Sequence, residues 1–516
     1  MVKKIYILVL LACVCTGLLS FFASGIHHIG TSYQLDYGEG MCWWQSVHIT
    51  DYTLAYKPLD QYPYMVVHYP PLYHLAARQA AALSGNWIEA ARLISLAATA
   101  GIALAIGAII FAALPRRTSF WHRLAAVLFG IAIPYPLDSL RFAWIARVDM
   151  LALFLTFATL AVFVIFWDSL PAQAIAVMLS VAACFTKQTS YTALLTLLLL
   201  VLLVRPRRAL ALGAMAMISA GLLVGYMSLV TRGGFLLNTF VYNINPFSLR
   251  QMMIQLQLHF SKAVPLVAFA AGETAALCAY LLRHGFGQAT RRVRSALMHS
   301  PSHRALIVLA VHLFFAAAQL PSLGKQGAYL NYFIVFDLTC GALAGFLLFR
   351  LLLSWRPGRV AAPAAVAAAA ALCAILVPLP PEITEAAGSP AHRLADQRHR
   401  AAYAEALRLV KSTPGLVYSE DLRLLMDAGK EMPAEPAIVT TLARAGRWDE
   451  TPFRRMFLER KFGLVVVYED LSNPDRFTAG VRQAIEENYQ PTRISDDFTV
   501  YRPRPGSAPS VTAQNR

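Results

Sequence analysis

Charged side chains are scarce in this sequence. Only 14% of its 516 residues are Asp, Glu, Lys or Arg, whereas 57% are hydrophobic, and the mean hydropathy is +0.51. A soluble globular protein carries roughly 25% charged residues, so the composition excludes a soluble protein and indicates that much of the chain faces lipid. The formal net charge of +16 does not indicate nucleic-acid binding, because most basic residues form short clusters at the ends of apolar runs.

Short motifs for nucleotide or hydrolytic chemistry are also missing. The sequence contains no Walker motif, no GxGxxG, no HExxH and no GxSxG, so nucleotide use, zincin-type hydrolysis and a serine nucleophile elbow have no support. The 7 Cys fall inside apolar segments, except Cys42 in a loop, and none has CxxC or His/Cys metal spacing. We therefore expect small buried thiols without a disulfide framework, and we predict no metal ligands.

Apolar runs long enough to cross a membrane recur along the chain. The first follows two Lys and has roughly 20 apolar residues, longer than the core of a cleaved signal peptide, so we interpret it as a retained span. The two runs on either side of Lys187 could instead form one broken helix. In total we predict about 11 spans, near residues 5–25, 88–114, 122–137, 148–167, 172–187, 190–204, 209–231, 263–282, 305–321, 330–353 and 359–379.

Basic clusters predict the orientation of these spans. If Lys3 and Lys4 face the cytoplasm, strict alternation places every later arginine cluster on the same side, as the positive-inside rule requires. These clusters lie near residues 116–123, 205–208, 283–304 and 356–359. The loop at 26–87 and everything after about residue 380 are then extracytoplasmic. Polar residues concentrate on that outer side, in the turns at 134–149, 186–190, 231–262 and 321–332. This asymmetry indicates that the active face lies on one side of the membrane.

The composition changes after residue 380. Charged residues become common, and helical and β-strand patterns alternate. GLVYSE and FGLVVVYED predict buried strands, and FTVYRP predicts a last strand. We therefore predict a polytopic α-helical membrane domain at 1–380, a small extracytoplasmic α/β domain at 381–503, and a disordered tail at 504–516.

The first long loop carries the strongest candidates for chemistry. Asp36 and Glu39 are spaced i, i+3, so both carboxylates would face the same way on a helical turn. A carboxylate flanked by aromatic residues near the membrane surface can act as a general base, although a solvated acidic turn has the same pattern. His68 and Tyr69 follow in a Tyr- and Pro-rich stretch, which could form a sugar-stacking wall, a phosphate contact or an interfacial aromatic belt.

Cations and amides on the later outward turns are further candidates. Arg147 and Asp149 open a span, either as a local salt bridge or as part of a site. Lys187, with Gln188 beside it, lies where an apolar run turns outward, so it either snorkels or binds a phosphate. A later outward turn carries three similar candidates, Lys325, Asn331 and Tyr332.

Several of these stretches together resemble one family. DYGEG after the first span, then YPPLYHL, RVDMLAL, TKQT and NYF, resemble the GT-C superfamily of polytopic glycosyltransferases, in its bacterial family 39-like branch of protein-mannosyltransferase and aminoarabinose-transferase type. SEDLRLLMDAGK, LARAGRWDE and RKFGLVVVYED continue the resemblance, which covers nearly the whole chain. It implies a GT-C-like fold.

What the resemblance implies is a transferase that takes a sugar from a polyprenyl-phosphate donor and inverts its anomeric carbon, on the extracytoplasmic face of a bacterial cytoplasmic membrane. It implies that Asp36 or Glu39 activates the acceptor hydroxyl, with Asp149 as a supporting acid. The residues implied to hold the phosphate are Lys187, Arg147 and Lys325, and the other substrate-binding candidates are His68, Tyr69, Gln188, Asn331 and Tyr332.

Two departures from the family pattern leave roles open. Relatives often carry adjacent acids in the first loop, whereas here Tyr37 and Gly38 separate them, so either acid could be the base. Relatives also often have a Lys before the paired prolines, where this chain has His68 and Tyr69. The acceptor is a glycan, lipid or protein, and divalent metals assist some relatives and not others, so cofactor use is open.

Two other functions compete with this interpretation. A lipid or glycan transporter, or a flippase, would show internal repeats or broken helices in matching halves. We find no such symmetry, and one very long first loop is unusual for a carrier. A non-catalytic member whose C-terminal domain binds a glycan or a partner is the second alternative.

Overall fold

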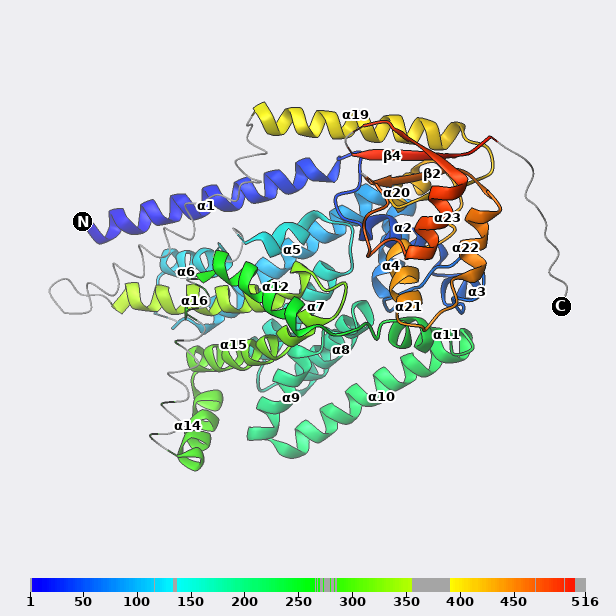
Figure 1. Cartoon of the computed structure of the whole chain (residues 1–516). Coiled ribbons are helices and arrows are strands. Elements are labelled where there is room, and N and C mark those ends of the chain that lie inside the picture. Colours follow the sequence, from blue (N-terminus) through cyan, green and yellow to red (C-terminus); the bar gives the residue numbers. More distant parts are fainter. Residues whose placement is uncertain are drawn as a thin grey trace.

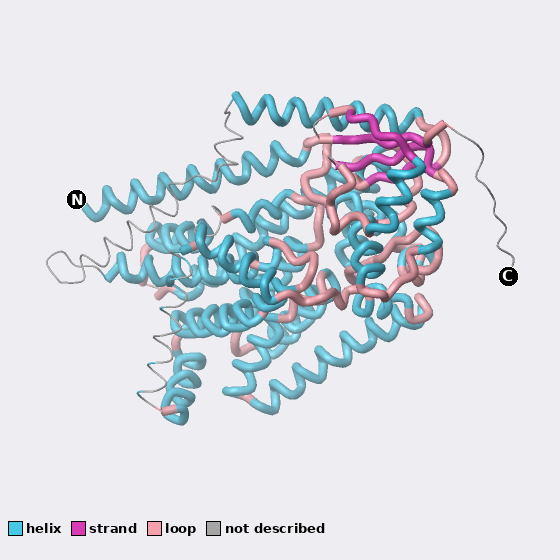
Figure 2. Tube along the Cα trace, in the orientation of Figure 1, coloured by secondary structure: helices cyan, strands magenta, loops and turns pink. Residues whose placement is uncertain are grey.

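The computed structural model describes most of the chain (Figures 1 and 2). Outside the described residues are 1, 116, 133–136, 265, 267, 270–271, 273–278, 280–282, 284, 355–389, 469, 496 and 506–516. The span predicted at 359–379 therefore lies outside the described residues, as do most of the span predicted at 263–282 and most of the predicted tail.

Long apolar helices form the main body of the molecule (Figure 1). They are α1 (Val2–Ile29), α5 (Trp87–Ala113), α6 (Phe120–Ala132), α7 (Asp149–Ile165), α8 (Leu170–Thr186), α9 (Thr192–Val204), α10 (Pro206–Val230), α15 (Pro301–Ala318) and α16 (Ile334–Ser354). Side-chain oxygens of Asn86, Ser169 and Ser300 cap the first turns of α5, α8 and α15, which explains where these helices begin. A turn separates α8 from α9, so the two apolar runs beside Lys187 form two helices.

Three described helices are long and apolar enough to cross a membrane: Trp87–Ala113, Pro206–Val230 and Pro301–Gly324. A fourth results if η1 (Asp138–Trp144) and α7, which meet at 101°, are one bent span. The shorter apolar helices are Val14–Ile29, Phe120–Ala132, Leu170–Thr186, Thr192–Val204 and Ile334–Leu347. The lengths and apolar composition of these helices indicate a multi-pass membrane protein. The total of about 11 spans stays a prediction.

Shorter elements join the long helices. They are α11 (Gly234–Leu236), the π-helical turn η2 (Leu237–Val241), α12 (Leu249–Lys262), α14 (Phe286–His299), η3 (Leu320–Gly324) and η4 (Leu330–Tyr332). Within the bundle α5 packs closely against α7. Gly101 permits this close approach, since a Cβ at this position would lie only 2.5 Å from the Phe154 ring.

The segment between α1 and α5 folds into three further helices. They are α2 (Gly38–His48), α3 (Tyr52–Ala55) and α4 (Leu72–Ser84). Gly40 lets α2 touch the C-terminal part of the chain directly, since a Cβ there would clash with the backbone nitrogen of Arg423.

One buried ion pair fixes this segment to the bundle. Arg92 of α5 and Glu39 of α2 have side chains that are 0% exposed, and Arg92 Nη2 donates to Glu39 Oε2 at 2.7 Å. Glu39 also accepts from Leu35 N (2.8 Å) and Ala146 N (2.9 Å). Arg92 also donates to four backbone carbonyls, those of His28, Ile29, Thr31 and Tyr33. The pair therefore ties together the end of α1, the start of α2 and the segment before α7.

Residues 390–503, here called the C-terminal region, contain the only sheet among the described residues. Its elements are α19 (Pro390–Ser412), β1 (Leu416–Ser419), α20 (Leu422–Asp427), α21 (Pro436–Arg444), α22 (Thr451–Leu458), β2 (Phe462–Tyr468), α23 (Ala479–Asn488), β3 (Tyr489–Arg493) and β4 (Phe498–Pro503). The sheet has the order β1-β2-β4-β3, with β1 parallel to β2 and the other pairs antiparallel. Val465 to Val467 in β2 are fully buried, because helices and neighbouring strands surround this central strand.

The C-terminal region lies at one end of the bundle, beside α2 and α4 (Figures 1 and 2). Met41 of α2 and Tyr73 of α4 belong to the same buried hydrophobic cluster as Val417, Leu422 and Leu464. Because this core is shared, the outer end of the bundle and the C-terminal region bury a joint surface. The domain boundary predicted near residue 380 stays a prediction.

We expect Glu39→Ala to destabilise the protein strongly, because it leaves the Arg92 guanidinium buried without its counter-ion. Removing one partner of a buried ion pair costs roughly 3–5 kcal/mol. The measurement is the thermal unfolding midpoint in detergent, with Glu89→Ala as the matched control, since Glu89 is an exposed acid on the same helix as Arg92. Equal midpoints for the two variants would contradict the structural role of Glu39.

Candidate active site

A cavity of about 710 Å³ lies where the first loop, turns between helices of the bundle and the C-terminal region meet. The predicted site residues that line it are Asp36, His68, Tyr69, Arg147, Lys325, Asn331 and Tyr332. Asp149 and Lys187 line a neighbouring smaller cavity, whereas Glu39 and Gln188 line neither. Most of the predicted candidates are thus brought together at one place.

Four alternating charges run along the wall between the two cavities. Lys187 Nζ donates to Asp149 Oδ1 at 2.6 Å, and Arg147 Nε donates to Asp149 Oδ2 at 3.3 Å. Arg147 Nη1 then donates to Asp36 Oδ1 at 2.6 Å. We call this row of Lys187, Asp149, Arg147 and Asp36 the charge ladder. It joins the end of α8, the start of α7 and the segment just before α2.

Local backbone structure explains where the ladder stands. The bend between η1 and α7 places Arg147 in the break between the two helices and Asp149 at the first position of α7. Asp149 lies in the first turn of α7, where a negative charge is favoured by the helix dipole, and Lys187 follows the last turn of α8, where a positive charge is favoured. Each charge is therefore supported by its helix as well as by its neighbour.

The prediction that Asp36 and Glu39 face the same way is wrong. Asp36 precedes α2, and its Oδ1 accepts from Gly38 N (2.8 Å) and from Arg147, on the cavity wall. Glu39 lies in the first turn of α2 and points into the core onto Arg92. The two carboxylates separate because each has its own arginine, on different sides of the chain.

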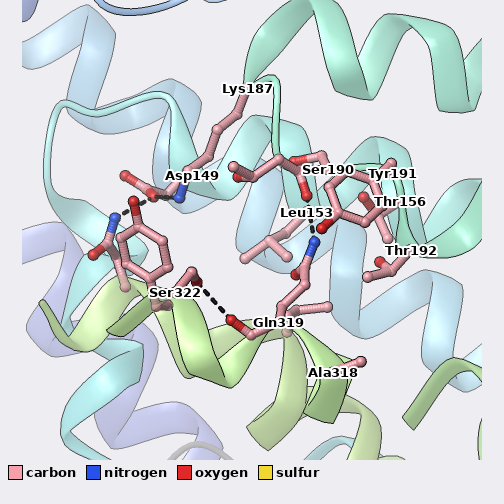
Figure 3. A pocket seen from close by; sticks show the side chains of 14 residues that line it. Asp149, Leu153, Thr156, Lys187, Ser190, Tyr191, Thr192, Ala318, Gln319 and Ser322 are labelled. Carbon is pink, nitrogen blue, oxygen red and sulfur yellow. Dashed lines mark hydrogen bonds and ion pairs between the residues drawn. The ribbon is translucent and has the colours of Figure 1, made fainter. Parts of the chain in front are cut away.

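The smaller cavity, of about 140 Å³, lies beside the Lys187–Asp149 pair (Figure 3). Its wall is rich in hydroxyl and amide groups, including Ser190, Thr192 and Gln319 (Figure 3). Asn331, whose Nδ2 donates to Asp149 Oδ1 at 2.9 Å, lines both cavities, as does Tyr332. The Lys187 Nζ lies 5.0 Å from the centre of the Tyr332 ring, close enough for a cation–π contact. The ladder thus borders a polar space on each side.

Lys325 differs from the cations of the ladder. It follows η3 on the wall of the large cavity, and no ion pair to it is found in the part of the chain that the structure describes. Gln251 Nε2 donates to its carbonyl oxygen at 3.1 Å, so its backbone is held in place. Burial, and to a smaller extent the nearby Lys187, lower the pKa of Lys325 from its usual value. Lys325 is therefore a cation that lacks a compensating anion.

His68 and Tyr69 also line the large cavity. His68 Nε2 lies 2.7 Å from Glu435 Oε2, and its carbonyl oxygen accepts from Gln188 Nε2 (3.0 Å) and Asn243 Nδ2 (2.9 Å). Gln188 therefore contributes to the cavity indirectly, by holding the backbone of His68 in place. The Tyr69 hydroxyl accepts from Arg147 Nη2 at 3.4 Å, and burial raises the pKa of Tyr69 well above its usual value, so the phenol stays protonated.

The C-terminal region contributes lining residues that no sequence pattern marked. Glu435 begins α21 as its N-cap residue, and Arg476 stacks on Tyr37 with its guanidinium carbon 3.8 Å from the ring centre. Both residues lie several hundred positions from the first loop, so only the tertiary contact reveals them. Within the described residues, no group of three His, Cys, Asp or Glu side chains is placed to hold a metal ion.

The ladder predicts a rescue experiment on stability. Lys187→Met should lower the thermal unfolding midpoint, since removing one partner of a buried pair costs roughly 3–5 kcal/mol. Adding Asp149→Asn should recover part of this loss, because the buried carboxylate that has lost its lysine then carries no charge. Lys461→Met is the control, since the Lys461–Glu459 pair is exposed and such pairs are worth about 0–1 kcal/mol. A double variant less stable than Lys187→Met would contradict the pairing.

Comparison with known proteins places this site in a known fold. No family model and no curated protein matches the sequence. Among solved structures, ArnT from Cupriavidus metallidurans in the apo state is similar over 95% of this chain and 97% of that chain, with TM-score 0.56 and 16% identity. ArnT bound to undecaprenyl phosphate is similar over 96% of this chain and 98% of that chain, with TM-score 0.54 and 16% identity.

An archaeal protein has the same arrangement. The oligosaccharyltransferase AglB from Archaeoglobus fulgidus, in complex with an inhibitory peptide and a dolichol-phosphate, is similar over 96% of this chain and 75% of that chain, with TM-score 0.53 and 11% identity. Both neighbours are GT-C glycosyltransferases, and at these identities the likeness concerns the fold. The chain therefore has the fold of the GT-C superfamily of glycosyltransferases.

Proposed function

We propose that this protein is a membrane glycosyltransferase that moves a sugar from a polyprenyl-phosphate donor to an acceptor hydroxyl, with inversion at the anomeric carbon. The observation that carries the proposal is one cavity with two groups that lack a partner among the described residues: the second carboxylate oxygen of Asp36 and the ammonium group of Lys325. The fold supports it, because structures of this fold hold undecaprenyl phosphate in ArnT and a dolichol-phosphate in AglB.

The donor phosphate binds next to Lys325. A phosphodiester anion is attracted by an ammonium group without a partner, whereas Arg147 and Lys187 already share their charge with Asp36 and Asp149. Arg147 and Lys187 therefore orient neighbouring groups of the site but add no net positive charge to it. The neighbouring side chains that complete the substrate site are His68, Tyr69, Asn331 and Tyr332, and Gln188 supports it by holding the His68 backbone.

Asp36 is the base in this proposal. Its Oδ1 is occupied by Gly38 N and Arg147, its Oδ2 has no hydrogen-bond partner among the described residues, and its side chain is 18% exposed. Asp149 has both oxygens engaged, by Lys187 and Asn331 on one and Arg147 on the other, so it is a supporting acid. Glu39, with both oxygens bonded in the core, positions the segment instead of serving as the base.

The chemistry follows from these positions. Asp36 takes the proton of the acceptor hydroxyl while the acceptor oxygen attacks the anomeric carbon from the face opposite the phosphate. The bond from that carbon to the phosphate oxygen breaks, and the phosphate leaves with its electron pair. Lys325 stabilises the charge that grows on the phosphate in the transition state, while Arg147 holds Asp36 in place. The arginine clusters support an extracytoplasmic active face in a bacterial cytoplasmic membrane, with the N-terminus inside.

Asp36→Asn tests the base. We expect kcat to fall by about 10²–10⁴-fold, the usual contribution of a general base, with the donor KM nearly unchanged. The measurement is release of undecaprenyl phosphate from undecaprenyl-phosphate hexoses and pentoses, by protein in liposomes with cell-envelope extract as acceptor source. Asp60→Asn is the matched control, an exposed acid of the same loop. Full turnover by Asp36→Asn would remove Asp36 as the base.

Lys325→Arg tests the phosphate site through its pH dependence. The ammonium group is charged below its pKa, which is lowered, so binding of undecaprenyl phosphate should weaken as pH rises through that lowered value. Arginine keeps its charge, so Lys325→Arg should shift this weakening to higher pH, while Lys325→Ala should lose roughly tenfold in affinity or more at neutral pH. The measurement is binding of undecaprenyl phosphate alone. The same alkaline midpoint in wild type and Lys325→Arg would exclude Lys325 from the site.

A further inference from the structure

His68 meets an acidic residue of the C-terminal region on the cavity wall. The side chains of His68 and Glu435, joined at 2.7 Å, are only 11% and 3% exposed. Both residues line the large cavity, although 367 positions separate them in the sequence. The pair therefore exists only because the C-terminal region packs on the first loop.

The backbone on both sides of this pair is fixed. A β-bridge joins Tyr64 of the first loop to Ala434, and Glu435 N donates to Tyr64 O at 3.1 Å. The carbonyl oxygen of His68 is held by two amide side chains, from the turn after α8 and the segment after η2. Side chains whose backbones are held this way lose little entropy when they engage a substrate, so the pair is preorganised.

The chemistry of the pair complements that of Asp36. Glu435 engages Nε2 of His68, and His68 Nδ1 has no hydrogen-bond partner among the described residues. Arg147 engages Oδ1 of Asp36 in the same way. The cavity thus presents an imidazole held by a carboxylate and a carboxylate held by a guanidinium group. An imidazole and a carboxylate are the side chains that most often serve as acid and base in catalysis.

We propose that His68 is a general acid for the departing phosphate and that Glu435 is its positioning residue, an inference that rests on the proposed function. As the acceptor oxygen bonds to the anomeric carbon, its proton passes to Asp36. The bond from the carbon to the phosphate oxygen breaks, its electron pair goes to that oxygen, and His68 Nδ1 delivers a proton to the phosphate. Return of one proton from Asp36 to His68 through solvent restores both groups.

His68→Gln removes the transferable proton and keeps a polar side chain. We expect kcat to fall by about 10²-fold or more, with the donor KM within about threefold of wild type, because the proton is needed in the transition state. Glu435→Gln should lower kcat less, and the double variant should lose no more than His68→Gln, because Glu435 acts through His68. The measurement is release of undecaprenyl phosphate from an undecaprenyl-phosphate hexose or pentose by the full chain in liposomes.

The control is Glu486→Gln, an exposed acid of α23 in the same region, which should keep wild-type turnover. Unchanged binding of undecaprenyl phosphate by His68→Gln shows that this variant is folded. A His68→Gln kcat close to wild type, a rise in KM alone, or independent losses in the double variant would overturn the inference. The proposed function fails separately, when the wild type itself releases no undecaprenyl phosphate or Asp36→Asn stays fully active.

Discussion

The charge ladder is the constraint on which the rest of the site depends. Its four members alternate in sign, and neighbouring partners lie 2.6 to 3.3 Å apart. A buried charge costs several kcal/mol unless a partner and further hydrogen bonds compensate it. The end of α8, the start of α7 and the segment just before α2 must therefore meet in one geometry. The break between η1 and α7 serves this need, because it moves Arg147 out of the helix and between two carboxylates.

Because the ladder is balanced, it separates two tasks that otherwise interfere. A single cation that both oriented the base and bound the phosphate would weaken the base as soon as the anion arrived or left. Here Arg147 fixes Asp36, while Lys325, from a different turn, supplies the excess positive charge. The residue proposed as the base, Asp36, thus has a cationic partner distinct from the cation proposed for the phosphate.

Sequence reasoning predicted the helices well and the site in part. The thickness of a bilayer sets the length of the apolar run that crosses it. The spans expected at 88–114 and 148–167 accordingly match α5 and α7 within about two residues. Charged residues at turns beside apolar helices are costly in lipid, and Arg147 and Lys325 both line one cavity, whereas their roles stay predictions. The i, i+3 spacing of Asp36 and Glu39 did not predict where the Glu39 side chain points. That side chain points toward Arg92, which belongs to α5 and lies elsewhere in the sequence.

Contacts across several hundred residues explain what the sequence did not reveal. Glu435 belongs to no recognisable sequence motif. Its contact with His68 is visible only in the folded chain, where a β-bridge between Tyr64 and Ala434 brings the two residues together. A bundle end without this cover would leave the cavity open to water, which weakens every charge interaction in it. The C-terminal region covers part of this cavity and adds side chains such as Glu435 and Arg476 to its wall. The cover and the transmembrane bundle are therefore parts of a single site.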